Sequence, residues 1–389
     1  MLISLESVRK LSEIISCKKE TFCSGLFLSA RWFVVSQLDY DGIQLVVLPD
    51  KESAEYCAAD LYNLIEGDDV FFLPDSGKNI ERSNYKSSLG VQRTSAIGKI
   101  LEYKEGEQMI IITYPSALEE VIPEKGKISG SLLKLAAGDE KPYEEIKEIL
   151  FVNGFERVDF VSEPGQFAVR GALIDIFSYS FNNPFRISFF GDEIESINIF
   201  DANTQLSMEK VDFVDIYPDL SSSEDSDGAM VTDILPESTL VWMDSSDMYK
   251  DKSFFSELQK FKNIYMELPL SRQEEEVIKF NISPQPVFNK NFELLTEDIR
   301  TKIENGYRVR IYGEKQSQLE RLQAILSQNG GIMPEFVAGK NIHNGFIDHD
   351  NKVCCYSDHE IFDRFHRVSI RRTVEKSEQL TINDLTSFA

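Results

Sequence analysis

The stretch that decides the fold is residues 154–201, GFERVDFVSEPGQFAVRGALIDIFSYSFNNPFRISFFGDEIESINIFD. Apolar and polar residues alternate near 158–160, 186–189 and 196–199, and residues 172–177 are mostly apolar. Turn-forming residues interrupt the pattern at 162–165, 182–184 and 191–192. Alternation broken by turn residues indicates short strands joined by tight turns. We therefore predict a small antiparallel sheet, with a helix at 143–150 packed on one face and the other face free.

Three residues suggest that the free face is used. Arg170 and Arg186 occur in otherwise apolar strands, each expected to begin one, and Phe190 follows Phe189. Consecutive strand residues point to opposite faces, so one phenylalanine of this pair leaves the core; the even spacing puts Phe190 on the side of Arg186. Arginines beside an exposed aromatic ring are typical of a protein-binding hot spot. The alternative is that both arginines only pair with local acids, such as Glu163, Glu193 and Glu195.

The same stretch carries a family resemblance. Residues 163–177 (EPGQFAVRGALIDIF) and 186–197 (RISFFGDEIESI) closely resemble the second domain of the transcription-repair coupling factors, which is similar to the second domain of the excision-repair protein UvrB. Two blocks in order at the right separation are more specific than a short motif. The resemblance implies that this domain binds the damage-recognition protein UvrA, through Arg170, Arg186 and Phe190.

The rest of the chain shows the alternating strand and helix patterns of an α/β protein. Strand-like and helix-like segments alternate in residues 1–128 and again in 211–270, which indicates a parallel sheet covered by helices. We predict an α/β fold: a degenerate helicase-like domain in two halves (1–128 and 211–270), with an inserted small antiparallel β-rich (α+β) domain at 129–210. A further α/β domain at 271–375 and a linker tail at 376–389 complete the expectation.

A helicase-type motor carries G-x-x-x-x-G-K-[ST] after its first strand. The early segment 24–30, SGLFLSA, has no lysine. Near Gly77-Lys78, Phe72 stands where the first glycine belongs, and Asn79 replaces the Mg²⁺-binding hydroxyl. Such loops cannot hold β- and γ-phosphates. We therefore expect no catalytic residue and no cofactor in this chain, and the resemblance likewise implies a motor fold that has lost its ATP site.

The resemblance also implies what would follow this chain: a polymerase-binding domain and an ATP- and Mg-dependent DNA translocase. The chain is therefore expected to be an N-terminal piece whose contacts with RNA polymerase and DNA lie in missing C-terminal domains. Its expected function is to recruit UvrA to stalled RNA polymerase for nucleotide excision repair of the transcribed strand. The alternative is a UvrB-like nucleotide-dependent DNA repair enzyme, which the missing phosphate loop disfavours.

The composition argues against two classes of partner, nucleic acid and membrane. The net charge of the 389 residues is −24, and only residues 17–19 and 369–372 are locally basic, so autonomous DNA binding is not expected. The five cysteines form no paired CxxC, which is typical of reduced thiols in a cytosolic protein. No apolar signal core and no run of 18 apolar residues occurs, so we expect a cytoplasmic protein without a membrane partner.

Other acidic and histidine-containing segments carry weak signals. Residues 359–363 (HEIFD) resemble the zinc-protease motif H-E-x-x-H, with His366 nearby, but Asp363 stands where the second histidine belongs. The acids at 192–195 follow a glycine turn in the predicted sheet, and we interpret them as a polar strand face. We predict no metal site.

Overall fold

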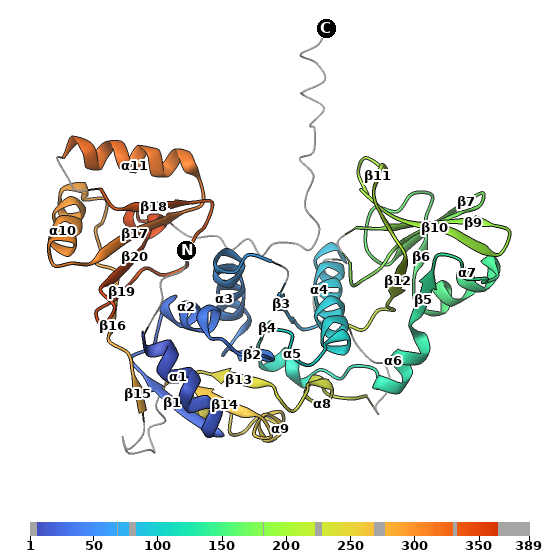
Figure 1. The fold of residues 1–389 in the computed structure, drawn as a ribbon, viewed down its shortest axis with the longest axis horizontal. Coiled ribbons are helices and arrows are strands. Elements are labelled where there is room, and N and C mark those ends of the chain that lie inside the picture. The colour runs from blue at the N-terminus through green and yellow to red at the C-terminus, as the bar shows by residue number, and fades with distance from the viewer. Residues whose placement is uncertain are drawn as a thin grey trace, which may run out of the picture. The chain divides into compact units, whose positions relative to one another are not determined.

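The structure is a computed structural model that describes residues 6–67, 69–77, 83–181, 183–221, 228–267, 277–329 and 333–364. The chain divides into two compact units (Figure 1). The first comprises residues 1–72, 104–115 and 236–370, and the second comprises 73–103, 116–235 and 371–389. Among the described residues, no helix combines the length and the apolar character needed to cross a membrane.

The first unit contains a seven-stranded sheet in the order β15-β1-β14-β13-β2-β4-β3, in which all neighbours are parallel. Its strands are β1 (Glu20–Ser24), β2 (Ile43–Val47), β3 (Val70–Phe72), β4 (Met109–Thr113), β13 (Leu240–Met243), β14 (Lys262–Tyr265) and β15 (Val277–Lys279). Every residue of β2 and of β4 is buried, as expected for apolar strands covered on both faces. Helix α1 (Glu6–Cys17) precedes β1, and between the strands lie α2 (Ala30–Gln37), α3 (Lys51–Leu64), the 3₁₀ turn η1 (Ser246–Met248) and α9 (Phe255–Leu258).

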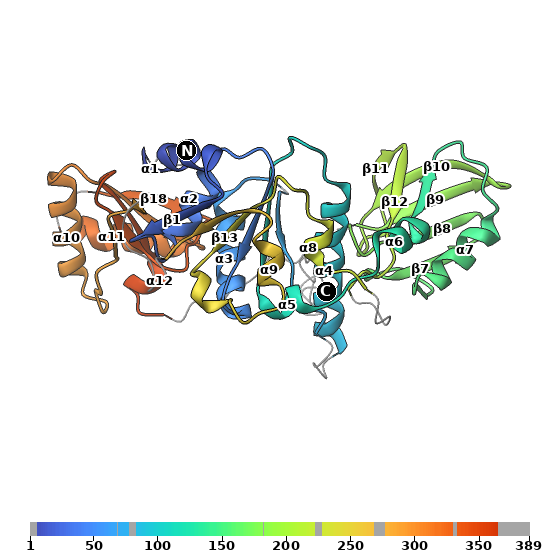
Figure 2. The same cartoon turned by 90° about the horizontal axis from the view of Figure 1, so that it is seen from below.

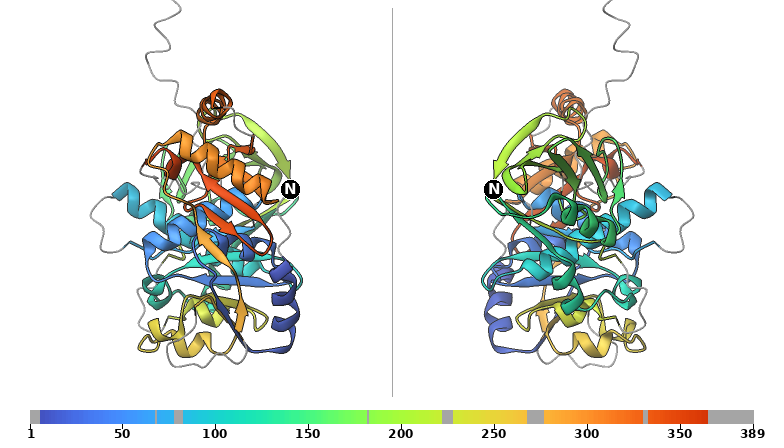
Figure 3. Two further views of the ribbon diagram at one scale, coloured as in Figure 1. Left: turned by 90° about the vertical axis from the view of Figure 1, so that its left-hand side faces the viewer. Right: turned by 90° about the vertical axis from the view of Figure 1, so that its right-hand side faces the viewer.

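A five-stranded mixed sheet, in the order β16-β19-β20-β17-β18, belongs to the same unit (Figure 3, left, orange to red). Its elements are β16 (Ile282–Pro284), α10 (Phe292–Glu304), β17 (Arg308–Gly313), α11 (Gln316–Gln328), β18 (Glu335–Ala338), β19 (Phe346–Asp348), β20 (Val353–Ser357) and α12 (Asp358–Ile361). The two sheets of this unit are in contact, because the ring of Phe33 in α2 meets the rings of Tyr312 and Phe346 edge-on. The amide of Asn63 also donates to the carbonyl of Asn341 at 2.9 Å.

The second unit is built around a six-stranded sheet in the order β11-β10-β9-β8-β7-β6 (Figures 1 and 2). Its strands are β6 (Glu156–Arg157), β7 (Gln166–Arg170), β8 (Leu173–Phe177), β9 (Phe185–Phe190), β10 (Glu193–Phe200) and β11 (Ser207–Val211). All neighbours are antiparallel except β6 and β7. Helix α7 (Tyr143–Val152) packs Ile146 and Leu150 against one face, where they join the main core of this domain. The predicted helix-covered face is thus confirmed. The prediction that the opposite face is free was wrong, because Val161 packs there in a small second core with Ala168, Phe177 and Phe200.

A two-stranded ribbon links the ends of this segment, because β5 (Leu133–Ala136) pairs antiparallel with β12 (Phe213–Ile216). The remaining helices of the second unit are α4 (Ser83–Glu102), α5 (Pro115–Glu119, from its second residue), α6 (Lys125–Ser131) and α8 (Val231–Ile234). The buried guanidinium of Arg93 in α4 donates to the carbonyls of Pro74, Ala117 and Ser221, which ties three loops of the unit together.

These sheets confirm the predicted fold class: a parallel-sheet α/β domain, an inserted antiparallel β-rich domain and a further α/β domain. The inserted domain was predicted to end at residue 210, but β12 (Phe213–Ile216) still pairs with β5 of that segment. The parallel-sheet domain was predicted to end at residue 270, but β15 (Val277–Lys279) still pairs with β1. Both are short edge or ribbon strands, and neither shows alternation over a long enough run to be predicted. Residues 222–227 (SSEDSD), Lys78, Asn79, the basic stretch 369–372 and the tail 376–389 lie outside the described residues.

Candidate partner-binding face

The face of the six-stranded sheet opposite α7 carries all three residues singled out from the sequence. Arg170 is the last residue of β7, and Arg186 and Phe190 lie in β9. The prediction that Arg170 begins a strand was wrong, since the chain turns at Gly171 and β8 starts only at Leu173. Phe189 is 5% exposed in the core, whereas Phe190 is 80% exposed, so Phe190 is the member of the pair that leaves the core.

One buried acid joins the two arginines. Asp175 in β8 is 1% exposed and lies directly across from Arg186 in the strand register. The Nε of Arg186 donates to Oδ1 of Asp175 at 2.8 Å, and its Nη2 donates to Oδ2 at 2.9 Å. The Nη2 of Arg170 also donates to Oδ2 of Asp175. Strands β7 and β9 are not neighbours, so Asp175, on the strand between them, holds both guanidinium groups on one face.

Both arginines do pair with an acid of the same domain, as the alternative reading of the sequence held, but the acid is not one of those suggested there. Both arginines pair with Asp175 instead of Glu163, Glu193 or Glu195. Sequence reasoning missed this residue, although a signal was present: Asp175 is the single acid in the apolar run 172–177. A carboxylate that points into a sheet face needs a partner of opposite charge to be buried.

The side chain of Arg186 is almost fully engaged within the domain. Besides Asp175, it donates to the main-chain oxygen and the side-chain Oε1 of Gln205, at 3.2 and 3.4 Å. Its guanidinium lies 4.3 Å from the centre of the Phe200 ring. The hydrogen bonds to Asp175 raise the pKa of Arg186 above its usual value, so the group is charged at any physiological pH. Only 18% of the side chain is exposed.

Arg170 is engaged less completely. Its side chain is 35% exposed, and Asp175 is its ion-pair partner. The buried Nε of Arg170 has no hydrogen-bond partner within the described part of the chain. On the solvent side, its guanidinium lies 4.9 Å from the centre of the Phe160 ring, and Phe160 is 60% exposed.

The charges and rings together define what the face can bind. The cluster of Arg170, Arg186 and Asp175 carries a net charge of +1 on a chain whose net charge is −24. An arginine with free donors can receive a carboxylate of another protein, and an exposed ring next to it can enter an apolar pocket. The face is thus suited to a protein surface that offers an acid beside an apolar hollow.

In the first unit, the loop between β1 and α2 stands where a phosphate loop would be expected. Gly25 has a φ of +70°, and a Cβ there would meet the carbonyl oxygen of Phe280 at 2.1 Å. The hydroxyl of Ser29 donates to Asp60 at 2.5 Å and accepts from the main-chain N–H of Asn344 at 2.9 Å. Leu26 is buried. Protein groups therefore occupy the loop that would otherwise surround phosphates.

Next to that loop, Arg31 in α2 donates to Asp244 at 2.6 Å and to Glu267 at 2.9 Å. The guanidinium of Arg31, at the start of α2, is therefore paired with two acids of the same unit. The weak zinc motif also separates, because His359 is buried against the hydroxyl of Ser357 while Asp363 pairs with Lys290 at 3.7 Å. His366 lies outside the described residues. No group of three potential metal ligands occurs among the residues that the structure describes.

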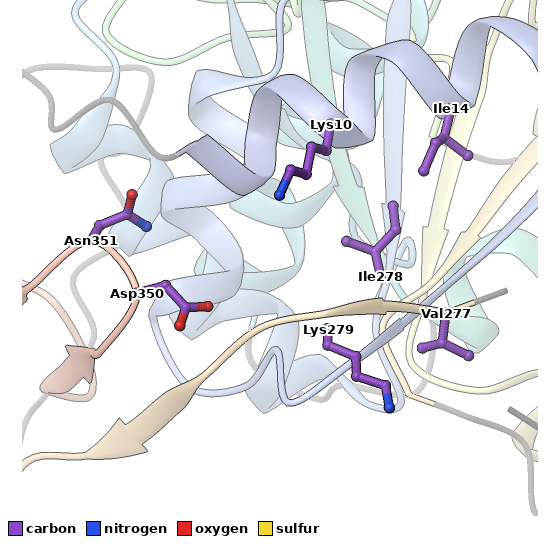
Figure 4. Close-up of a pocket in the computed structure, with 7 residues that line it drawn as sticks. All are labelled: Lys10, Ile14, Val277, Ile278, Lys279, Asp350 and Asn351. Atoms are coloured by element: carbon purple, nitrogen blue, oxygen red, sulfur yellow. The ribbon is translucent and has the colours of Figure 1, made fainter.

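A pocket of about 470 Å³ lies between α1 and β15 (Figure 4). Its lining combines aliphatic and charged side chains and offers no cysteine, histidine or serine: Lys10, Ile14, Val277, Ile278, Lys279, Asp350 and Asn351. This lining contains no nucleophile with an adjacent base. The candidate site therefore remains the arginine-bearing face of the second unit.

Comparisons with known proteins agree with the resemblance predicted from the sequence. A model of the UvrB interaction domain family matches residues 133–221, which include the whole six-stranded sheet. The transcription-repair-coupling factor of Mycobacterium tuberculosis is 30% identical over 191 residues, which cover 47% of this chain and 15% of that protein. The Bacillus subtilis protein of the same name is 29% identical over 203 residues, covering 51% and 17%. The Escherichia coli protein is 31% identical over 110 residues, covering 28% and 10%. The match thus spans about a sixth or less of the length of these relatives.

Proposed function

We propose that this chain is a non-catalytic recruitment module for nucleotide excision repair. Its residues 133–221 match the UvrB interaction domain, and the chain is similar to transcription-repair-coupling factors. Its inserted sheet domain binds UvrA and brings it to RNA polymerase stalled at damage. The observation that carries this proposal is that the exposed Phe190 and two arginines lie on the same sheet face, opposite α7 and within the matched segment.

The chemistry of the face defines the complementary surface on UvrA. An acidic side chain there would face Arg170, and an apolar pocket would receive the ring of Phe190. Aromatic and arginine anchors commonly contribute about 2 kcal/mol or more when truncated, or roughly thirtyfold in affinity. The net negative charge of the chain argues that this attraction is local and that nucleic acid is not the partner.

The chain contributes recruitment rather than catalysis. Groups of the protein itself occupy the loop between β1 and α2, which supports the absence of an ATP site. We assign ATP- and Mg-dependent translocation, and the contacts with RNA polymerase and DNA, to the parts of the coupling factors that this chain does not match. The proposed place of action is the cytoplasm, where transcription and repair meet.

A titration of the chain with purified UvrA, followed by calorimetry, tests the proposal. Wild-type chain should bind, and Phe190→Ala should bind about thirtyfold more weakly. The matched control is Phe213→Ala, since Phe213 is 71% exposed on β12 of the same domain but belongs to the two-stranded ribbon. Absence of binding by wild-type chain, or an equal loss in both variants, would overturn the proposed function.

A further inference from the structure

We propose that Phe160 is an additional anchor of the UvrA-binding face, with Arg170 lying between its ring and that of Phe190. In this arrangement Arg186 acts as a positioning residue: it orients Arg170 through Asp175 and does not itself contact the partner. This inference rests on the proposed function, because it assigns roles within the same face.

Phe160 is held in place even though its ring is exposed. It lies between Val158 and Val161, and both pack into a small second core with Ala168, Phe177 and Phe200. The main-chain N–H of Val158 donates to the carbonyl of Phe167 at 2.9 Å. The carbonyl of Val161 accepts from Gln205 at 3.3 Å. The ring is thus presented by a segment that is fixed on both sides.

The turn that follows is fixed in the same way. The main-chain N–H groups of Ser162 and Glu163 both donate to Oε1 of Gln166, at 2.9 and 3.0 Å. A side chain on an ordered segment loses little conformational entropy on binding, and such preorganisation increases affinity. An exposed ring on a fixed segment is therefore a better anchor than one on a loop that must be ordered first.

Phe160 also differs from a single exposed apolar residue, which would need no explanation. Its ring lies 4.9 Å from the guanidinium of Arg170, at a distance typical of a cation–π contact. That contact limits the orientations available to Arg170, the more exposed arginine of the pair, whose side chain is 35% exposed. A ring that both orients an arginine and keeps 60% of its own surface exposed is placed to contact whatever the arginine binds.

The strand register places the proposed anchors in a strip. Arg170 lies across from Leu173, which lies across from Ser188, and Phe190 is two residues further along β9. Two strand spacings and two residues along a strand separate Arg170 from Phe190 by roughly 12 Å. Phe160 follows β6, which pairs with β7 on the side away from β8 and β9, and its ring contacts Arg170. We therefore expect the strip to accommodate a segment of several residues of the partner.

Arg186 lies on the same face of β9, two residues before Ser188. It is across from Asp175, its donors go to Asp175 and Gln205, and the Phe200 ring covers its plane. A guanidinium in this position has little left to offer a partner. Its removal would instead free Asp175 to draw Arg170 inward, since Asp175 would keep Arg170 as its partner.

The experiment measures UvrA affinity for Phe160→Ala, Phe160→Leu and the control Phe213→Ala. Phe160→Ala should bind about tenfold more weakly with unchanged thermal unfolding, and Phe160→Leu, which keeps apolar bulk, should lie between it and wild type. Because the ring contacts Arg170, the double variant Phe160→Ala/Arg170→Ala should lose less affinity than the sum of the two single losses.

The positioning role has its own readout. Arg186→Ala and Asp175→Asn should weaken binding in the wild-type chain but have no further effect once Arg170 is alanine. A residue that contacts the partner directly would keep its effect in that background. If Phe160→Ala binds like wild type while Phe190→Ala does not, the inference fails and the proposed function stands. If wild-type chain does not bind UvrA, both fail.

Discussion

The substitution Arg186→Ala is expected to destabilise the inserted domain, whereas Arg170→Ala and Phe190→Ala are not expected to do so to the same degree. Among the residues that the structure describes, three side-chain hydrogen bonds reach the carboxylate of Asp175, which is 1% exposed, and Arg186 supplies two of them. After its removal, a buried carboxylate retains a single bond, from the partly exposed Arg170.

The magnitude follows from the burial of this group. Removing one partner of a buried ion pair commonly costs about 3–5 kcal/mol. Because Arg170 stays in place, we expect about 2–3 kcal/mol, to which the lost packing on the Phe200 ring also contributes. Truncation of the 80%-exposed Phe190 should change stability by less than about 0.5 kcal/mol.

The assay must report on this domain alone. Both tryptophans, Trp32 and Trp242, are buried in the first unit, so intrinsic fluorescence follows the wrong part of the chain. Hydrogen exchange of peptides from β8 and β9 reports the local opening free energy directly. A cost of about 2 kcal/mol corresponds to roughly thirtyfold faster exchange of their protected amides.

The matched control is Arg157→Ala, which removes the same charge from an exposed position on β6 of the same sheet. Its exchange should equal that of wild type. Equal exchange rates for Arg186→Ala and Arg157→Ala would refute the reasoning, because Asp175 would then tolerate the loss of its main partner without cost.

Three further outcomes are expected. Calorimetry with Mg·ATP should show no binding heat, because Ser29 and Asn344 occupy the loop after β1, and micromolar affinity would contradict this account. Undamaged duplex DNA should not shift in a gel at sub-micromolar chain and physiological salt, given the net charge of −24. Burial raises the pKa of Asp60 to about 7, against about 3.9 in the unfolded chain. Because the folded chain holds this proton more tightly, the free energy of unfolding falls as the pH rises from about 4 to about 7. The stability of wild type relative to Asp60→Asn should therefore fall across that range in chemical denaturation followed by tryptophan fluorescence, and a constant difference would contradict it.

Local patterning was sufficient to predict much of the inserted domain. The alternation around residues 187–189 identified β9, and the apolar run 172–177 identified β8, because each faces the core with every second residue. The same logic put Arg186 and Phe190 on one face, since that inference needs only a strand period of two.

The ion pair inside the face could not be predicted in the same way. Which acid meets Arg186 depends on the strand order, and β8 lies between β7 and β9 only because hairpins connect them in sequence. The nearby glutamates looked equally suitable by sequence distance. Likewise, Phe160 showed only as a polar–apolar alternation, and its contact with Arg170 arises from a loop that folds back along the sheet.

The pairing of β5 with β12 has a consequence for how such a domain is inherited. Leu133 lies across from Ile216, so the two ends of the segment that carries the six-stranded sheet lie at adjacent points. Chain ends that lie close together allow a domain to be inserted into a loop of another protein with little disturbance of the recipient. A recombination event would need to open only one peptide bond of a surface turn to receive the whole cassette. The sheet and its arginine face can in this way be inserted or exchanged as one unit.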